Sequence, residues 1–564
     1  MAVPARRAVV AAFGERGLRL EASAATLLAD AVADAGGGDG GKGALAALLD
    51  AYEPGEKRGG VWVAVGAGPW LPGAARPPSR EPNAHPLSLS GASAVLDAAA
   101  ARKLLNAASG ADAAPIVTVV SAFDAPRVTY DPSRRAFACT PPPPSGAPRL
   151  GAAPDRASLY LDRFYRVAQR VERHPLFARP ALAGAGARAR AARGACPLAD
   201  VRTLSGAPPG VTAYVLGTIA QLEDGRFFLE DPTGRVALDL SAAATSAGFF
   251  CEGVVAVVEG ELTPARVLRA RALGMPPAEA RAATLAGPAA GADWFAGGRA
   301  RVDKDEEALA AQAADPGRRL VVLADVRLDA PAAVDRLAAV FRGFESAAGP
   351  PPTFVLTGDF YVGPPSDAVG RAAAFARLAA AAAACPRLRD GSDWIFVPGA
   401  ADALAPGALP LAPLRAADAA PLAAALPRAH FPSNPARVRV AGRDVVVFRS
   451  PMASTLRARA LLPPAGGEGG GSAAGFEHAA VTLLQQAHLA PLPLHDAPVH
   501  WAADAGMALY PLPHALVLAG GGGPASFSFE GCACVDPGGF AAGGSFAAYA
   551  PASGAVEMCE LPDE

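Results

Sequence analysis

A short stretch at residues 354–360, FVLTGDF, joins a strand-like apolar run to a glycine and a carboxylate. Two-metal phosphoesterases hold their ions with carboxylates near the ends of buried strands, because divalent cations take hard oxygen ligands. Such a site also needs several imidazoles, since both ions must be ligated and a bridging water must be activated. The stretch therefore raises the question of whether the rest of the chain supplies those ligands.

The other strand ends do not supply them. The ligand pattern of binuclear phosphoesterases runs Asp-x-His, Gly-Asp-x-x-Asp, Gly-Asn-His-Asp/Glu, a lone His and Gly-His-x-His. The six degenerate positions here are Asp325, Arg327, Asp359, Val362, Ala401 and Asp402. Arg327 stands at the first histidine position, where its fixed positive charge would repel a metal. We therefore predict no bound metal, no cofactor and no catalytic residue, and we expect Asp325 and Asp359 to accept hydrogen bonds from loop amides.

Histidines and cysteines offer no better ligand pattern. Five of the eight histidines lie within residues 478–514, but their spacings do not repeat, which favours core or interface roles. Cys532 and Cys534 with Cys559 could in principle bind a metal, but ordinary buried thiols are the favoured interpretation. Seven scattered cysteines without CxxC pairs indicate a reducing compartment, either nucleus or cytosol.

Length and charge narrow the class of protein. A chain of 564 residues is too long for one core and indicates roughly three domains. Its 51 basic and 53 acidic side chains give a net charge of −2, so no global positive field would draw it onto nucleic acid. The longest apolar run, residues 378–385, is far shorter than the roughly 20 residues of a membrane span. We expect a soluble chain without a secretory signal.

The periodicity of the apolar residues changes along the chain. Helical spacing predicts a small helical domain over residues 1–75, followed by a variable linker region over 76–158. Residues 159–290 are predicted to form a helix and an OB-type barrel, because period-two runs alternate with Asp-Gly and Thr-Gly turns. Residues 291–564 alternate strand and helix, which predicts a layered α/β domain. Predicted linkers or loop insertions are the Gly/Pro-rich or Ala/Arg/Gly stretches at 35–43, 140–148, 182–195 and 462–475.

Several longer motifs add a resemblance. The stretch HLAPLPLHDAPVHWAADAGMALYPLPHALVLAG at 488–520 is accompanied by FLEDPTGRVALDL in the expected barrel, by FVPGAAD after a later strand and by CVDPGGF near the end. Together these motifs resemble the B-subunit family of eukaryotic replicative DNA polymerases, in its epsilon type. The resemblance covers most of residues 159–550, and Trp501 within it is expected to be buried.

The resemblance implies both a fold and a role. The fold is multidomain α+β, with an N-terminal helical domain, an OB-type β-barrel and an α/β metallophosphoesterase-like (calcineurin-like) domain that has lost its metal ligands. The implied role is a non-catalytic nuclear accessory subunit that scaffolds the C-terminal region of the catalytic subunit of DNA polymerase epsilon in chromosomal replication and repair. Residues 1–75 would bind the GINS component of the replicative helicase. Small histone-fold polymerase subunits and DNA within the holoenzyme are further implied partners, and no membrane is implied.

Two alternatives stay open beside this role. A free-standing OB-fold single-strand DNA-binding protein would stack bases on aromatic side chains interleaved with basic ones. The predicted barrel offers Tyr214, Phe227 and Phe228 beside Arg226 and Arg235. An active metallophosphoesterase is the other alternative, which the missing ligands disfavour.

Overall fold

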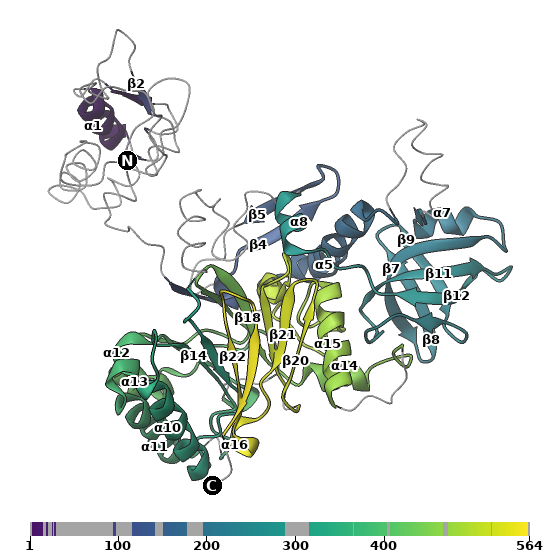
Figure 1. Ribbon diagram of the computed structural model, residues 1–564. Coiled ribbons are helices and arrows are strands. Elements are labelled where there is room, and N and C mark those ends of the chain that lie inside the picture. The colour runs from purple at the N-terminus through teal and green to yellow at the C-terminus, as the bar shows by residue number, and fades with distance from the viewer. Residues whose placement is uncertain are drawn as a thin grey trace. The chain divides into compact units, whose positions relative to one another are not determined.

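The chain forms two compact units, residues 1–115 and residues 116–564 (Figure 1). The computed structural model describes residues 3–14, 18–20, 25, 28–29, 94–96, 116–140, 151–177, 196–287, 315–364, 366–402, 407–465, 472–520 and 522–561. In the first unit, helix α1 (Val3–Gly14) buries Val9 and Phe13, and β1 (Leu18–Leu20) pairs in parallel with β2 (Ala94–Leu96). The helix agrees with the predicted helical start of the chain.

The second unit contains two stacked six-stranded sheets, built mostly from its C-terminal part. The first sheet has the order β16-β15-β14-β13-β22-β23, and the second has the order β20-β21-β19-β18-β17-β3. The first sheet comprises β13 (Leu320–Leu323), β14 (Thr353–Thr357), β15 (Trp394–Val397), β16 (Ala429–His430), β22 (Ser545–Tyr549) and β23 (Val556–Glu560). The second comprises β3 (Val117–Ser121), β17 (Ala436–Val440), β18 (Arg443–Arg449), β19 (Ala515–Ala519), β20 (Ala525–Phe529) and β21 (Cys532–Asp536). We call these two sheets with their helices the layered part.

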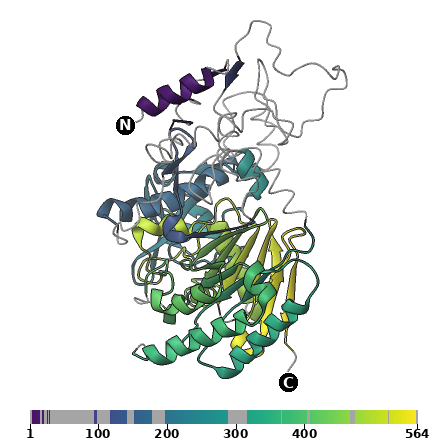
Figure 2. The same cartoon turned by 90° about the vertical axis from the view of Figure 1, so that its left-hand side faces the viewer.

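Strands of the layered part are apolar on both faces, because each face is covered. In β13, Leu320 and Val322 belong to the core between the sheets, whereas Val321 and Leu323 face the helices. The helices on the outer side of the first sheet (Figure 2) are α10 (Pro331–Ser346), α11 (Ala368–Ala383), α12 (Pro386–Gly391) and α13 (Ala416–Ala425). Helices α14 (Met452–Ala458) and α15 (Ser472–Gln486) pack against the second sheet. This architecture confirms the predicted layered α/β domain.

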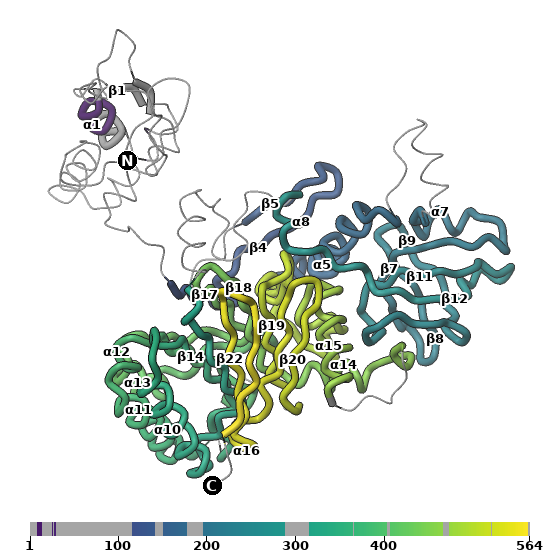
Figure 3. The backbone as a smooth tube through the Cα atoms, in the orientation of Figure 1, coloured from purple at the N-terminus to yellow at the C-terminus, as the bar shows by residue number. Residues whose placement is uncertain are grey.

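The barrel is closed by pairing of β9 with the last long strand, β12. Its strands are β6 (Leu198–Ala199), β7 (Thr212–Glu223), β8 (Arg226–Asp231), β9 (Gly234–Asp239), β10 (Ala244–Thr245), β11 (Val255–Leu262) and β12 (Val267–Gly274), with α7 (Val201–Gly206) between the first two. β7 pairs with both β8 and β11, and β12 pairs with β11 and β9. The turn at Asp224 and Gly225 lies where the sequence predicted it, and Gly225 takes a φ of 71°. Figure 3 shows these strands beside α14 and α15.

Helix α5 (Ala153–Arg173) connects the barrel to the layered part. Its buried side contains Leu159, Val167 and Val171 together with three arginines, and its contacts include β4 (Arg127–Asp131), β7, α15 and the 3-10 helix η3 (Trp501–Met507). A second 3-10 helix, η1 (Ala122–Asp124), precedes the hairpin of β4 and β5 (Ala136–Thr140). The short helix α8 (Arg281–Ala286) follows the barrel in the chain. The short helix α16 (Phe540–Gly543) directly precedes β22.

The structure corrects the predicted domain boundaries in two places. Residues 76–158 are not a variable linker throughout, because β3 pairs with β17 of the second sheet and residues 127–140 form a hairpin. A boundary at residue 75 would separate β1 from β2, whereas the compact units divide after residue 115. Three of the predicted linkers lie wholly or almost wholly outside the described residues, namely 35–43, 140–148 and 182–195. In the fourth, 462–475, the last four residues begin α15.

Candidate functional site

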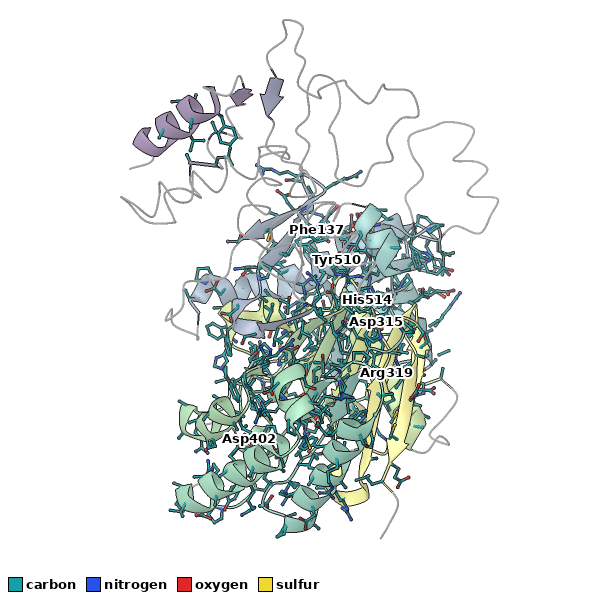
Figure 4. All side chains as sticks on the ribbon, turned by 60° about the vertical axis from the view of Figure 1, so that its left-hand side comes forward. Phe137, Asp315, Arg319, Asp402, Tyr510 and His514 are labelled. Carbon is teal, nitrogen blue, oxygen red and sulfur yellow. The ribbon has the colours of Figure 1, made fainter. Side chains whose placement is uncertain are left out.

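Three carboxylates follow three neighbouring parallel strands of the first sheet. Asp325 comes after β13, Asp359 comes after β14, and Asp402 ends the 3-10 helix η2 (Ala400–Asp402) that follows β15. Parallel strands end at a common edge, which is the usual ligand-binding edge of layered α/β folds. The structure thus places the three carboxylates of the degenerate motifs at one edge of the first sheet. Figure 4 labels Asp402 well away from Tyr510 and His514.

Asp402 is buried and bonded to backbone amides. Its carboxylate accepts the N–H of Phe360 at 3.0 and 3.1 Å, of Tyr361 at 3.2 Å and of Gly399 at 2.9 Å. Burial raises the pKa of Asp402 to about 7, against the opposing effect of the amides of Gly399 and Phe360. Asp402 therefore fastens the loop after β14 to the loop after β15.

Glycine is required in both of these loops because they approach each other closely. A Cβ on Gly358 would lie 2.0 Å from Oδ2 of Asp402, and a Cβ on Gly399 would lie 2.1 Å from Oδ1 of Asp359. Oδ1 of Asp359 also accepts the N–H of Ala401 at 2.8 Å. Loop packing thus accounts for the Gly-Asp sequence that raised the question of metal chemistry.

The guanidinium of Arg449 lies between the carboxylates. Its Nη2 is 2.5 Å from Oδ1 of Asp325 and 3.4 Å from Oδ2 of Asp359, and its side chain is 13% exposed. Its Nε donates to the carbonyl oxygen of Gly358 at 2.8 Å, and Nη1 donates to that of Ala519 at 3.3 Å. One fixed positive charge therefore joins the ends of strands from both sheets.

The buried side chain of Asn434 holds the backbone of Arg449 in place. Asn434 donates Nδ2–H to the carbonyl oxygen of Arg449 at 2.6 Å and accepts the Arg449 N–H at Oδ1 at 3.0 Å. Asp536, the last residue of β21, lies near enough to interact electrostatically with both Asp325 and Arg449. Burial raises the pKa of Asp536 to about 6, and the neighbouring charge of Asp325 acts in the same direction.

Sequence reasoning missed Arg449, Asn434 and Asp536. A signal was present, because Arg449 ends an apolar strand and falls in the motif order where the phosphoesterase pattern has its lone histidine. The prediction instead placed the blocking charge on Arg327. That side chain is 40% exposed and binds Asp329 through Nε and Nη2 at 3.0 and 2.9 Å.

The two remaining degenerate positions face outward. Val362 is 47% exposed, and Ala401 contributes its backbone N–H to Asp359. Across the described residues, no group of three or more His, Cys, Asp or Glu side chains is arranged to hold a metal ion. The arrangement can hold loops together and neutralise buried carboxylates, and Arg449 would repel an incoming divalent cation.

The histidine-rich region places His488 in the core. Its Nδ1 accepts the N–H of Ala490 at 3.0 Å, so Nε2 carries the proton and donates to Oδ1 of Asp504 at 3.0 Å. Burial lowers the pKa of His488 to about 4. Burial alone would raise the pKa of Asp504, but Arg163 and His488 hold it well below its usual range. The prediction of a core role is confirmed for His488.

Comparison with known proteins assigns two parts of the chain to families. Residues 153–277 match the family described as DNA polymerase epsilon subunit 2-like, OB-fold domain, and residues 320–521 match the family of DNA polymerase alpha/epsilon B-subunits. The chain is 31% identical to the DNA polymerase epsilon B-subunit of Arabidopsis thaliana over 83% of this chain and 89% of that protein. It is 32% identical to DNA polymerase epsilon subunit 2 of Mus musculus over 79% of this chain and 84% of that protein, and 34% identical to the Drosophila melanogaster subunit over 80% and 83%.

The chain belongs to the DNA polymerase epsilon B-subunit family. It is accordingly an accessory chain of the DNA polymerase epsilon complex that acts in DNA replication, with a multidomain α+β fold that includes an OB-fold domain. Within the described residues, no helix has the length and apolar character needed to cross a membrane.

Proposed function

We propose that this chain scaffolds the C-terminal region of the catalytic subunit of DNA polymerase epsilon and links the polymerase to the GINS component of the replicative helicase in the nucleus. The barrel and the layered part carry the first role, and the unit at residues 1–115 carries the second. Contacts with small histone-fold polymerase subunits and with DNA in the holoenzyme belong to the same proposal. The sequence predicted that residues 1–75 bind the helicase, and we now propose the whole compact unit of residues 1–115 for this role.

The observation that carries the scaffold proposal is a core shared by the barrel and the layered part. One cluster of buried side chains includes Val215 and Leu229 of the barrel together with Phe448 of β18 and Leu483 of α15. Interfaces between independently moving domains are usually smaller and more polar than this continuous core. The two parts therefore present a single rigid surface to a partner.

Polar contacts within this core fix the register of α15 against the barrel. Gln486 accepts the N–H of Val255 and donates to its carbonyl oxygen, both at 2.8 Å. Thr482 accepts the N–H of Phe249 at 2.8 Å, and His478 accepts that of Gly248 at 3.1 Å. Because these bonds join side chains to backbone, they hold the barrel in one orientation.

The layered part acts without hydrolysis in this proposal. Arg449 supplies the positive charge among Asp325, Asp359 and Asp536, so the carboxylates are held by a guanidinium. We interpret Asp325, Arg327, Asp359, Val362, Ala401 and Asp402 as a degenerate phosphoesterase site whose remaining role is to fasten loops. The active-metallophosphoesterase alternative lacks support from any contact described above.

The barrel surface gives the single-strand DNA-binding alternative little support. Arg226 pairs with Glu223 at 2.8 Å, Arg271 pairs with Glu261 at 2.7 Å, and Arg269 lies 3.8 Å from Asp239. Phe227 packs against the core, while Arg235 lies over the ring of Phe228 at 5.7 Å from its centroid. Basic side chains that already face carboxylates attract phosphates weakly, so DNA contact is assigned to the holoenzyme.

Co-purification tests the scaffold proposal. The full chain, immobilised through a tag, should retain the C-terminal region of a polymerase epsilon catalytic subunit. The matching region of a polymerase delta catalytic subunit serves as the specificity control and should pass through. Failure to retain the epsilon region, or equal retention of both, would overturn the proposal.

A further inference from the structure

A small cavity lies where α5 and the end of η3 meet residues 125–140, which lead into and form the hairpin of β4 and β5. We call residues 125–140 the hairpin segment. It measures about 10 Å³, which is room for roughly one water-sized sphere. Ala125, Pro126 and Val128 line one side, and Arg166, Arg437 and Tyr510 also contribute to the lining. None of the described residues that line it is acidic.

Both guanidiniums at this cavity have N–H groups without a protein partner. Arg166 is 4% exposed and its buried Nη1 has no hydrogen-bond acceptor. The buried Nε of Arg437 also has none, although its Nη2 donates to the carbonyl oxygens of Gly506 and Ala508. Buried donors normally have acceptors, so unmet donors on two arginines that line one cavity point to an acceptor that lies between them.

The nearest carboxylates are engaged elsewhere. Asp162 and Asp504 line a separate cavity on which Arg166 also borders, and Asp504 binds Arg163 at 2.6 Å. Asp444, the carboxylate that attracts Arg437, pairs with Arg439 at 2.6 Å and also with Arg281. Asp162 and Asp504 attract Arg166, and Asp444 attracts Arg437, but each of these carboxylates is already paired with another arginine.

Mutual repulsion between the two arginines points to the same missing acceptor. Burial, together with the nearby positive charge of Arg166, lowers the pKa of Arg437 to about 10 despite the attraction of Asp444. Burial also lowers the pKa of Arg166. A water molecule would leave this repulsion in place and would need acceptors for its own two hydrogens. A monatomic anion accepts several N–H bonds and cancels the repulsion.

We propose that this cavity binds one chloride ion, which accepts hydrogen bonds from Arg166 and Arg437. Arg166 belongs to α5 and Arg437 belongs to β17, so the anion joins these two elements beside the hairpin segment. It thereby helps to hold the helix that connects the barrel to the layered part.

Thermal melting of the full chain tests the proposal. Chloride replaces gluconate at constant ionic strength, and a ligand that binds only the folded state should raise Tm by about 1–2 °C for each tenfold increase in chloride above its dissociation constant. Arg437→Met should abolish this dependence, because one of the two donors is lost. Arg235→Met removes a charge on the barrel surface and should leave the dependence intact.

Crystals of the unchanged chain grown with bromide provide a readout that does not depend on a variant folding. An anomalous peak between Arg166 and Arg437 would support the proposal. A Tm that is independent of chloride would overturn it, as would a bromide-free cavity or an equal chloride response in the Arg437→Met variant.

Discussion

At the scale of single residues, a guanidinium can take over the structural part of a metal site without its chemistry. Arg449 brings one positive charge and several donors to Asp325, Asp359 and the carbonyl oxygen of Gly358. A divalent ion would also lower the pKa of a bound water and polarise a phosphate ester. A guanidinium stays protonated and has no open coordination position, so the loops remain fastened while hydrolysis has no catalyst.

Replacing Arg449 should therefore be costly. Arg449→Met leaves Asp325 and Asp359 without their cation, and breaking a buried ion pair from one side typically costs about 3–5 kcal/mol in the free energy of unfolding. Urea denaturation would measure the loss. Arg327→Met is the matched control. The side chain of Arg327 is 40% exposed, so its ion pair with Asp329 should contribute less than about 1 kcal/mol to the free energy of unfolding. Equal stability of the two variants would contradict the assigned role of Arg449.

The buried histidine gives the chain a specific sensitivity to acid. The pKa of His488 is about 4 in the folded chain and about 6.5 when unfolded, so the unfolded state binds more protons between these values. The stability contributed by neutral His488 is complete above pH 6.5 and falls as pH drops toward 4, by at most about 3 kcal/mol.

His488→Gln should flatten that part of the pH profile. Glutamine can accept from Ala490 and donate to Asp504 without titrating. The difference between variant and unchanged chain is the useful quantity, because Asp402 and Asp536 have raised pKa values and favour the folded state at lower pH in both proteins. Parallel profiles between pH 4 and 6.5 would show that His488 is not the titrating group.

At the scale of elements, α15 joins the barrel to the second sheet in addition to α5. Its apolar residues share a core with the barrel, and Gln486 satisfies both backbone groups of Val255. An unpaired buried backbone group costs about 1–3 kcal/mol, so this side chain fixes orientation more strongly than an apolar contact of equal size would.

Gln486→Leu should loosen the barrel without unfolding it. With two backbone groups of Val255 left unpaired, hydrogen exchange of the Val255 amide should accelerate at least about tenfold, and mass spectrometry of β11 peptides would detect it. Gln221→Leu, at a half-buried position of β7, is the control and should leave exchange in β11 unchanged. Equal protection of Val255 in both variants would mean that packing alone holds the barrel.

Elements with strong periodicity could be predicted from the sequence, whereas contacts between distant segments could not. The turn at Asp224 and Gly225 and the layered strands followed from local pattern. The pairing of β3 with β17 joins residues more than 300 positions apart, and no local signal specifies it. Arg449 was missed for the same reason, because its partners lie at the ends of three other strands or directly after them. Trp501 was expected to be buried, but it is partly exposed beneath Arg156, and among the described residues the fully buried tryptophan is Trp394.

At the scale of the whole molecule, the division after residue 115 separates the two proposed roles. The first unit has its own buried residues and its own strand pair, so it does not depend on the second for the contacts described. The second unit begins with β3, an edge strand that covers β17 of the second sheet. A cut intended to isolate the two roles must therefore fall between β2 and β3.

Deleting residues 1–115 should leave the catalytic subunit bound and abolish retention of GINS, because the barrel and the layered part keep their shared core. Both would be measured by retention on immobilised partners. Deleting residues 1–125 is the matched control. It also removes β3 and the hydrogen bond from the Ala122 N–H to Ser433, so β17 loses a neighbour and retention of the catalytic subunit should weaken. If the shorter deletion lost the catalytic subunit, or if it still retained GINS, the assignment of one role to each unit would be wrong.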